Sequence, residues 1–461
     1  MNPTTDTHRA LVLGSGIAGL LAARVLADHF ERVTIAERDT LPTDASYRSG
    51  IPQARHAHGL LMRGLEVIER LFPGITDELE AAGAPRVEWM IDTLQWIPAG
   101  WTPRYPSGIV TWATSRALLE SIIRRRVAEL PNVDFVEDKV VCGLVTNPDR
   151  TRIIGVSLLS CLDILRGDLV VDATGRTSHM PEWLTEIGYR APEETIVDAH
   201  LGYATQVYRL PDGDQPDWKA LLIMTTPERP RGGVFQLIED GKWMMTLAGT
   251  AGDYPPTDEA ELRAFAQSIP APPLHDVLAV AQPISPVYGY RNTANRLRHY
   301  EKLDCLPDGL AVIGDAACAF NPVYGQGMTV AALGAEILDQ SLRQGFSSLI
   351  FQQRLAKGNQ QPWQMATGED YRYPVEGTPA TPFIKRIDRY ADWLFQAGTV
   401  EPEITSTFLS MMHLKSPLTA MFRPSLIARR LRYALRRKPA PVTLPSTIKA
   451  KIAEPTDALI P

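Results

Sequence analysis

The sequence has 461 residues, of which 44% are hydrophobic and 22% are charged, and this composition excludes a disordered or collagen-like chain. The formal net charge of −6 gives no reason to expect a nucleic-acid partner, which would call for a basic chain. At about 100–200 residues per domain, the length predicts roughly two to four domains or one large core with additions.

Cysteine usage and apolar runs bear on the cellular compartment. The four cysteines, Cys142, Cys161, Cys305 and Cys318, are far apart and form no C-x-x-C pair, which argues against a zinc site or a disulfide framework. We therefore expect a reducing, cytoplasmic location. No leader-like segment opens the chain and no apolar run reaches about 18 residues, so we expect no membrane span.

The first elements follow the pattern strand, glycine turn, helix, strand. Residues 10–13 are a short apolar run typical of a strand covered on both faces, and residues 20–30 have helical spacing before a second strand at 33–36. The glycines of the intervening motif Gly14-Ser-Gly-Ile-Ala-Gly19 allow a tight turn, close approach of a pyrophosphate and close helix–strand packing. Glu37 ends the second strand, where a carboxylate accepts hydrogen bonds from an adenosine ribose. Together these features predict dinucleotide binding.

Helical and β-rich stretches then alternate along the chain. Helices are predicted over 54–71 and 115–130, each followed closely by a proline. Two stretches, 87–114 and 197–249, are instead β-rich. The second contains predicted strands at 201–210, 220–226, 233–239 and 243–248, with Asp240-Gly241 as a tight turn. Their one-sided alternation predicts a sheet that lies over the nucleotide-binding unit.

Two further turns follow buried strands. After the strand at 169–171 comes Asp172-Ala-Thr-Gly175, which is equally compatible with a plain strand exit and with a ligand contact. After the strand at 311–313 comes Gly314-Asp315, and then Gly325-Gln-Gly327-Met328 opens a helix. Asp315 is a suitable hydrogen-bond partner for a polyol such as a ribityl chain. The N-terminus of the helix is suited to stabilise negative charge on the edge of a flavin.

The last part of the chain, from residue 336 onward, is predicted to be mainly helical. Between Arg423 and Lys451 it carries nine basic residues and no acidic one (Arg423, Arg429, Arg430, Arg432, Arg436, Arg437, Lys438, Lys449 and Lys451). One interpretation is an amphipathic helix near 426–435 that makes weak contact with anionic lipid. The favoured interpretation is a solvated helix face that runs into a proline-rich tail.

In their order and separation, the three glycine-bearing motifs resemble those of FAD-dependent monooxygenases of the aromatic-hydroxylase type, whose fold is also called glutathione-reductase-like. The match covers roughly residues 8–345. Segments 50–61 and 175–184 are similar to a narrower branch, the flavin epoxidases that act on polyene precursors of polyether antibiotics, near squalene epoxidase. The chain departs from the pattern at Asp172-Ala-Thr-Gly175, where the hydroxylases usually have Asp-Gly.

This resemblance implies an α/β fold with three parts. They are a Rossmann-like FAD-binding domain of the glutathione-reductase type, an inserted antiparallel β-sheet substrate domain, and a helical C-terminal region. The expected FAD-binding domain is discontinuous and comprises residues 1–80, 113–180 and 285–345. The substrate domain is expected over 81–112 and 181–284, and the helical region with its basic tail over 346–461.

FAD is the cofactor that the resemblance implies. The glycines of the first motif would hold its pyrophosphate, Glu37 the adenosine ribose and Asp315 the ribityl hydroxyls. The full expected set is Gly14, Gly16, Gly19, Glu37, Arg38, Arg55, Arg116, Val141, Asp315, Pro322, Gly325, Gly327 and Met328. Arg55 is included as a cation near the phosphates or the ribityl chain. We expect no metal at His56 and His58, because the spacing supplies no third ligand, and a covalent histidyl–flavin bond at His56 has little support.

The implied reaction inserts one oxygen atom of O2 into a hydrophobic, secondary-metabolite-like substrate through a flavin C4a-hydroperoxide, with olefin epoxidation slightly favoured over aromatic hydroxylation. NAD(P)H would supply electrons directly or through a partner flavin reductase. Such chemistry needs a dry apolar pocket rather than catalytic side chains, so we assign no catalytic residue. The expected pocket walls, each also an ordinary core residue type, are Trp89, Trp96, Trp112, Met224, Phe235, Trp243 and Met245.

Three alternatives compete with a monooxygenase. A flavin-dependent reductase of isoprenoid double bonds would use the same FAD site and an apolar tunnel, and a non-catalytic flavin-binding protein would use the FAD site alone. A halogenase is disfavoured, because that family needs a lysine in its N-terminal part and a Trp-x-Trp-x-Ile-Pro run. This chain has no lysine before Lys139, and residues 94–98 contain only a fragment of the run.

Overall fold

The computed structural model describes residues 8–159 and 163–435. Its centre is a parallel sheet of five strands in the order β20 (Leu310–Val312), β11 (Leu169–Asp172), β1 (Arg9–Leu13), β2 (Arg32–Ala36) and β7 (Val133–Val136). The strands are short apolar runs because helices or loops cover both faces. The predicted strands at 10–13, 33–36 and 169–171 are therefore found where the sequence places them.

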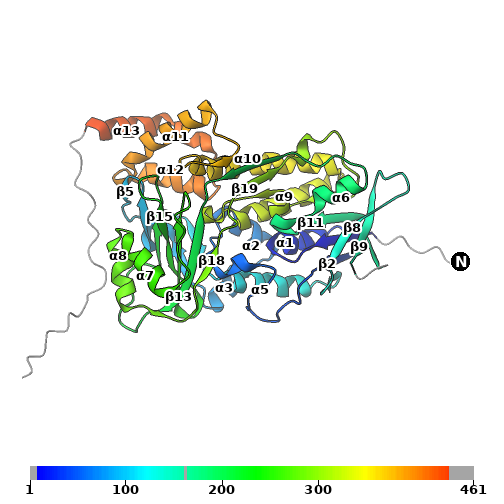
Figure 1. Ribbon diagram of the computed structural model, residues 1–461, viewed down its shortest axis with the longest axis horizontal. Helices are drawn as coiled ribbons and strands as arrows, with labels where there is room; N and C mark the ends of the chain where they lie inside the picture. The colour runs from blue at the N-terminus through cyan, green and yellow to red at the C-terminus, as the bar shows by residue number, and fades with distance from the viewer. Residues whose placement is uncertain (1–7, 160–162, 436–461) are drawn as a thin grey trace, which may run out of the picture.

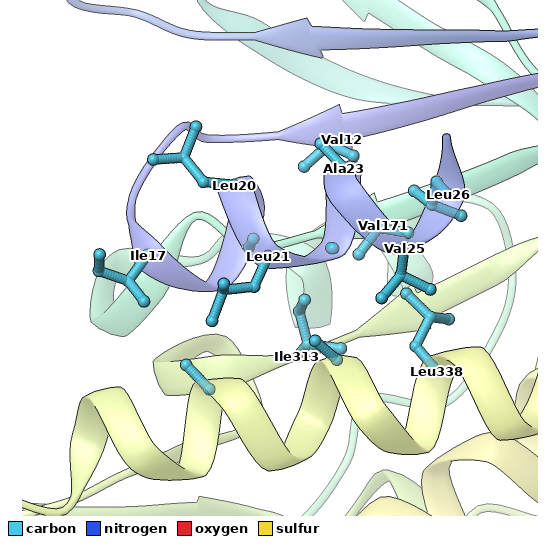
Figure 2. Packing of buried hydrophobic residues seen from close by; sticks show 14 of the residues in the cluster. Val12, Ile17, Leu20, Leu21, Ala23, Val25, Leu26, Val171, Ile313 and Leu338 are labelled. Atoms are coloured by element: carbon cyan, nitrogen blue, oxygen red, sulfur yellow. The ribbon is translucent and has the colours of Figure 1, made fainter. Parts of the chain in front are cut away.

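Helix α1 (Ile17–Leu26) begins directly after the first glycine motif and packs on this sheet. Its apolar side chains meet Val12 of β1, Val171 of β11, Ile313 directly after β20, and Leu338 from helix α9 (Gly327–Arg343) (Figure 2). Helix α5 (Arg116–Ala128) also packs against α1 and starts at an N-cap, because the side chain of Ser115 accepts a hydrogen bond from the Leu118 amide at 3.1 Å. This packing joins segments far apart in the chain into one core.

The predicted helix over 54–71 is wrong in its first part. The chain forms a short 3₁₀ turn, η1 (Pro52–Arg55), and then an extended loop before helix α2 (Met62–Leu71). The Ala57 amide donates to the Thr246 hydroxyl at 3.0 Å instead of to a carbonyl of its own segment. Tertiary hydrogen bonding therefore replaces the helical ladder here.

A second sheet, of eight strands, combines strands from both β-rich stretches with two short strands from residues 282–290. Its order is β17-β13-β16-β15-β14-β4-β5, with β18 also paired to β13, and β4 lies parallel to β14. Helices α7 (Glu259–Ser268) and α8 (Pro272–Val280) pack on one face of this sheet. The strands are β4 (Thr93–Ile97), β5 (Gly100–Trp101), β13 (Gly202–Arg209), β14 (Ala220–Ile223), β15 (Arg231–Leu237), β16 (Lys242–Gly249), β17 (Gln282–Pro283) and β18 (Tyr288–Tyr290).

Smaller sheets and helices complete the core. An antiparallel meander of β8 (Val141–Thr146), β9 (Ile153–Leu158) and β10 (Ile164–Arg166) lies on the connection from β7 to β11. A sheet of β21 (Cys318–Ala319), β19 (Asn295–Arg298), β12 (Glu194–Asp198) and β22 (Glu376–Gly377) draws strands from all three expected domains. The remaining short elements are β3 (Arg86–Glu88), β6 (Val110–Trp112), α3 (Ile75–Ala81), α4 (Trp89–Asp92) and α6 (Met180–Glu186).

The last part of the described chain is helical, as predicted. Helix α10 (Ser348–Asp370) runs beside α9, and α11 (Pro382–Phe395), α12 (Pro402–Met412) and α13 (Pro424–Leu435) lie over one end of the eight-stranded sheet (Figure 1). None of the helices in the described ranges is long and apolar enough to cross a membrane. The part of the predicted basic tail beyond residue 435 lies outside the described residues.

Candidate functional site

One large cavity, of about 1490 Å³, lies where the parallel sheet, the eight-stranded sheet and the C-terminal helices meet. The residues that follow three parallel strands all line it: Gly14 after β1, Ala173 after β11 and Gly314 after β20. The carboxyl ends of parallel strands share one edge of a sheet, which is where such folds bind ligands. The predicted convergence of the three glycine-bearing turns is therefore present.

The N-termini of two helices lie at the lining of this cavity. Helices α1 and α9 begin beside Gly16 and Gln326, and neither start has a side-chain cap or an acidic residue in its first turn. Free backbone N–H groups and the positive end of each helix dipole therefore remain available for anionic groups. Six cationic side chains line the same cavity: Arg38, Arg48, Arg116, Lys139, Arg176 and Arg372. This end suits the pyrophosphate of a dinucleotide.

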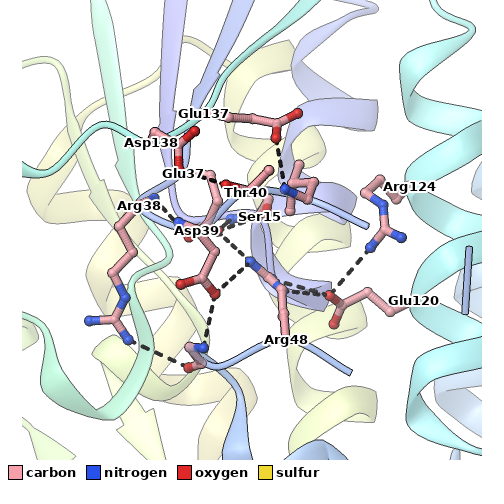
Figure 3. Close-up of polar contacts among 12 residues, drawn as sticks. Ser15, Glu37, Arg38, Asp39, Thr40, Arg48, Glu120, Arg124, Glu137 and Asp138 are labelled. Carbon is pink, nitrogen blue, oxygen red and sulfur yellow. Dashed lines mark hydrogen bonds and ion pairs between the residues drawn. The ribbon is translucent and has the colours of Figure 1, made fainter. Parts of the chain in front are cut away.

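A buried ion pair lies at the carboxyl ends of β1 and β2. The carboxylate of Glu37 accepts hydrogen bonds from the backbone amide and hydroxyl of Ser15, at 2.8 and 2.7 Å, and lies 2.8 Å from a guanidinium nitrogen of Arg48 (Figure 3). Burial alone would raise the pKa of Glu37, but Arg48 and the Ser15 hydrogen bonds lower it to about 2. Glu37 is thus an anion that shapes this corner of the cavity.

Arg48 is a site residue that sequence reasoning missed. Besides Glu37, its guanidinium lies 3.1 Å from Glu120 of α5 and 3.6 Å from Asp39 (Figure 3). Glu120 in turn pairs with Arg116 at 2.8 Å, so a chain of alternating charges runs along the cavity wall. Arg48 stands in an irregular loop with no motif spacing around it, so only the folded chain reveals its partners.

The third motif contributes an unsatisfied acceptor and a buried carboxylate. Gln326 is 2% exposed and lines the cavity, and its side-chain oxygen has no hydrogen-bond partner among the described residues. Buried polar atoms are normally paired, so this oxygen indicates a donor supplied by a ligand. Asp315 also lines the cavity; burial raises its pKa, while Arg176, 3.4 Å away, opposes that rise.

Helix α10 holds the third motif in place. The buried carboxylate of Asp370 accepts hydrogen bonds from the Tyr324 hydroxyl at 2.5 Å and from the side-chain amides of Asn295 and Asn321, at 2.5 and 3.1 Å. Burial raises the pKa of Asp370 to about 7, although these hydrogen bonds oppose the shift. The segment after Asn321 is thus held by α10, a helix of the C-terminal region and not of the expected FAD-binding domain.

The other end of the cavity is largely apolar. Trp89 and Met224, two of the expected wall residues, line it. The C-terminal helices contribute most of the rest, which sequence reasoning missed: Trp363, Ile384, Ile387, Phe395, Phe408 and Met412. Their apolar positions at helical spacing were a usable signal, but the sequence does not show which surface they cover.

Five of the expected wall residues do not line the cavity. Phe235, Trp243 and Met245 point to the opposite face of the eight-stranded sheet, where they are buried against α7 and α8. Their neighbours Val234, Gln236 and Thr246 line the cavity instead, because successive side chains of a strand alternate between faces. The other two are Trp96, which stacks on Trp101, and Trp112, which packs against the main core.

Two residues of the expected FAD-binding set also lie outside the cavity lining. Arg55 is held between the rings of Tyr47 and Tyr288, 4.9 and 4.6 Å from their centroids, so its charge is engaged on aromatic faces. Gly19 packs helix against strand, since a Cβ there would lie 1.9 Å from the Gly14 carbonyl oxygen. The set that lines the cavity is Gly14, Gly16, Glu37, Arg38, Arg116, Val141, Asp315, Pro322, Gly325, Gly327 and Met328.

The two histidines of the loop before α2 differ in position. His56 is buried behind the wall, with Nδ1 2.8 Å from the Thr205 hydroxyl, whereas His58 lines the cavity. Nδ1 of His58 lies 2.9 Å from the His56 carbonyl, which only accepts, so Nε2 of the neutral ring is an acceptor. Burial lowers the pKa of His58 to about 4. Among the described residues, no group of His, Cys, Asp and Glu is arranged to hold a metal ion.

Comparison with known proteins places the chain among relatives of its own length. No family model matches it. It is 33% identical over 450 residues to protein Rv3254 of Mycobacterium tuberculosis (strain ATCC 25618 / H37Rv), covering 93% of this chain and 94% of that protein. It is 26% identical over 356 residues to kynurenine 3-monooxygenase of Salinispora arenicola (strain CNS-205), covering 73% of this chain and 72% of the other.

Solved structures share the fold at low sequence identity. The flavin-dependent brominase Bmp2 superposes with a TM-score of 0.67 and 14% identity over 92% of this chain and 98% of that one. p-Nitrophenol 4-monooxygenase PnpA from Pseudomonas putida DLL-E4 gives a TM-score of 0.61 and 17% identity over 89% and 98% of the two chains. The predicted fold class is therefore confirmed.

Proposed function

Because the chain belongs to the same family as protein Rv3254 of Mycobacterium tuberculosis and has the fold of flavin-dependent oxygenating enzymes, we propose that it is an FAD-dependent monooxygenase of an apolar substrate. One observation carries the proposal. A single cavity joins an end suited to a pyrophosphate, with two uncapped helix starts and cationic side chains, to an end walled by aromatic and methionine side chains.

The described residues fit FAD. Gly16 leaves room for a phosphate at the start of α1, whereas Gly14 has a positive φ and packs against the Ala173 backbone. The unpaired Gln326 oxygen and the Nε2 acceptor of His58 suit hydrogen-bond donors such as those of a flavin ring and ribityl chain. Arg38, Arg116 and Asp315 would hold the remaining polar groups. Bound FAD supplies electron transfer to O2, so that one oxygen atom enters the substrate and the other leaves as water, with two electrons from NAD(P)H.

The protein's own part is to bind, orient and exclude water. The side chains of α11 and α12 cover the apolar end, so that a substrate held there is removed from bulk solvent. The Asp370 network fixes Tyr324 and the segment that opens α9, and through them the position of the cofactor edge relative to the substrate. Rigid positioning of this kind accounts for much of the rate in reactions without catalytic side chains.

For the reaction itself, we place olefin epoxidation ahead of aromatic hydroxylation, on the similarity of segments 50–61 and 175–184 to flavin epoxidases. The sequence relative named kynurenine 3-monooxygenase makes aromatic hydroxylation the second candidate. A separate flavin reductase is the alternative source of electrons to NAD(P)H itself.

The test is mass spectrometry of products formed from labelled O2 with purified protein, FAD and NADPH, across a panel of polyenes, phenols and polyketides. A product that gains one labelled oxygen supports the proposal, and its position separates epoxide from phenol. Adding bromide or chloride to the same reactions tests halogenation. Protein that binds no FAD, or substrate reduction without O2 uptake, contradicts the proposal.

A further inference from the structure

The apolar end of the cavity reaches the molecular surface beside α11 and the turn η8 (Leu418–Phe422). Phe383 and Phe422 both line the cavity and yet are 70% and 44% exposed, so they stand at its rim. The two elements are joined by Tyr390, whose ring stacks on Phe422 at 4.9 Å and whose hydroxyl donates to the Met421 carbonyl at 2.9 Å. These contacts hold α11 and η8 together, so the fold fixes the position of the rim.

Helix α13 extends this exposed apolar surface. Leu431 and Leu435, one turn apart, are 53% and 88% exposed, whereas Leu426 on the other side of the helix is buried. Arg430 anchors that inner side to α11, because its guanidinium donates to the Trp393 carbonyl and, at 3.0 Å, to the Gln396 side chain. Of the eleven exposed large apolar side chains in the described ranges, four thus lie on the contacting elements α11, η8 and α13.

Cationic side chains surround these apolar ones. Lys385, Arg386, Arg389, Arg423 and Arg432 are exposed, and none of them forms an ion pair with a described residue. Two of the acids nearby are engaged, since Asp392 pairs with Arg372, and Glu403 with Arg429, and a third, the half-buried Asp388, lines the cavity. The face made by α11, η8 and α13, which we name the rim face, is therefore positive with projecting apolar tips.

We propose that the rim face docks on the surface of a lipid bilayer that contains anionic phospholipid. Its cations would meet lipid phosphates while Phe383, Leu431 and Leu435 enter the boundary of the acyl chains. An acidic protein partner would require paired charges but not projecting leucines, so the bilayer is the occupant that both features fit. Docking would bring the cavity rim to the membrane, which gives an apolar substrate a route that avoids water; this last step rests on the proposed function.

The test is co-sedimentation of the full chain, loaded with FAD, with vesicles of phosphatidylcholine alone or mixed with phosphatidylglycerol. We expect retention on the mixed vesicles, weakened by salt. The variant Arg386→Gln/Arg389→Gln should lower the partition coefficient about 25-fold, at about fivefold for each cation. The variant Leu431→Ser/Leu435→Ser should lower it more than about tenfold. The matched control is Leu159→Ser/Ile164→Ser, which removes two exposed apolar side chains beside β9 and β10 at the far end of the molecule (Figure 1).

Equal FAD content and circular dichroism establish that each variant is folded. Absence of retention, equal retention on neutral vesicles, or retention that neither rim-face variant changes would each overturn the proposal; the last result would assign binding to residues 436–461. Sedimentation requires no turnover. If the chain binds the vesicles but oxygenates no substrate, the docking proposal is supported and only the proposed reaction is contradicted.

Discussion

At the scale of single residues, the cavity depends on charges that are buried but paired. Arg48 and Glu37 are each about 7% exposed in their side chains, and both would be unfavourable alone because desolvation opposes each charge. Together with Glu120 and Arg116 they form a chain in which each charge faces an opposite one. Removal of one member therefore leaves a buried charge without a partner, which is more destabilising than loss of an exposed pair.

We predict that Arg48→Met lowers the free energy of unfolding by about 3–5 kcal/mol at pH 7. In the wild type, the lowered pKa of Glu37 contributes stability that is present above its unfolded value of 4.5 and is lost as the pH falls toward about 2. In the variant, the buried carboxyl of Glu37 has lost its cation, so its pKa should be raised. The difference in unfolding free energy between wild type and variant should therefore become smaller as the pH is lowered and Glu37 takes up a proton. Urea unfolding at neutral and acidic pH measures this.

The matched control is Arg32→Met, which breaks an exposed pair with Asp134 at the same 2.8 Å separation. It should change stability by less than about 1 kcal/mol at either pH. Equal losses in the two variants would show that burial of the Arg48 pair has no energetic consequence.

The stability that Asp370 contributes changes with pH in the direction opposite to that of Glu37. The pKa of Asp370 is raised from 3.8 to about 7, so the folded protein holds a proton there that the unfolded chain releases. That contribution to stability is present below the unfolded value and is lost as the pH rises through 7. Asp370→Asn should therefore show a smaller fall in unfolding free energy between about pH 4 and 7, by up to about 4 kcal/mol, than the wild type. Parallel pH curves for the two proteins would contradict this.

At the scale of elements, the glycines of the first motif have different functions: Gly19 allows close packing, and Gly16 leaves open space. A Cβ on Gly19 would lie 1.9 Å from the backbone oxygen of Gly14, so this glycine lets α1 approach β1. A Cβ on Gly16 would meet nothing closer than the Ile51 side chain at 4.0 Å. The space over Gly16 is thus open in the protein itself, as a phosphate site requires.

We predict that Gly19→Ala destabilises the fold by about 1–3 kcal/mol or more, because backbone atoms must separate. Gly16→Ala should leave the stability of the FAD-free protein unchanged or slightly higher, yet weaken FAD binding at least about tenfold. Thermal unfolding without FAD and fluorescence titration with FAD separate the two effects. A Gly16→Ala protein with wild-type FAD affinity would remove Gly16 from the cofactor site.

The eight-stranded sheet shows why its wall residues were misassigned. Alternation along β15 and β16 correctly predicts two faces, an apolar one and, opposite it, a mixed one that includes Gln236 and Thr246. One is covered by α7 and α8, and the other faces the cavity. The large aromatic side chains of Phe235 and Trp243 lie on the covered face, where their rings stack with centroids 5.1 Å apart.

At the scale of the whole molecule, the cavity is assembled from segments along nearly the full described chain. Gly14 and Gly327 lie at opposite ends of the predicted FAD-binding sequence, and the C-terminal helices close the apolar end. A ligand that spans these segments stabilises all of them at once, since it binds only the folded arrangement.

We predict that FAD slows amide hydrogen exchange together at the starts of α1 and α9 and in the turn after β11, with protection approaching about 2.7 kcal/mol at a hundredfold excess over Kd where exchange needs global unfolding. Helices α11 and α12 should gain protection mainly when an apolar substrate analogue is added. Mass spectrometry of exchanged peptides reads both. Protection by FAD confined to α1 would show that the three turns do not share one ligand.

The amino-acid sequence by itself determined four of the five parallel strands, the glycine turns and the starts of α5 and α9, because these depend on local backbone freedom, capping and apolar runs. It missed the strand β7, and it placed the first helix at 20–30 where α1 covers 17–26. The fold class followed from the order of those motifs. The tertiary structure alone decided that Arg48 neutralises Glu37, that residues 56–61 leave the helix, that Asp370 holds the third motif, and that the last helices wall the cavity. The partner of a buried charge, and the face of an element that is buried, depend on which distant segment packs against it. A local sequence pattern does not contain that information.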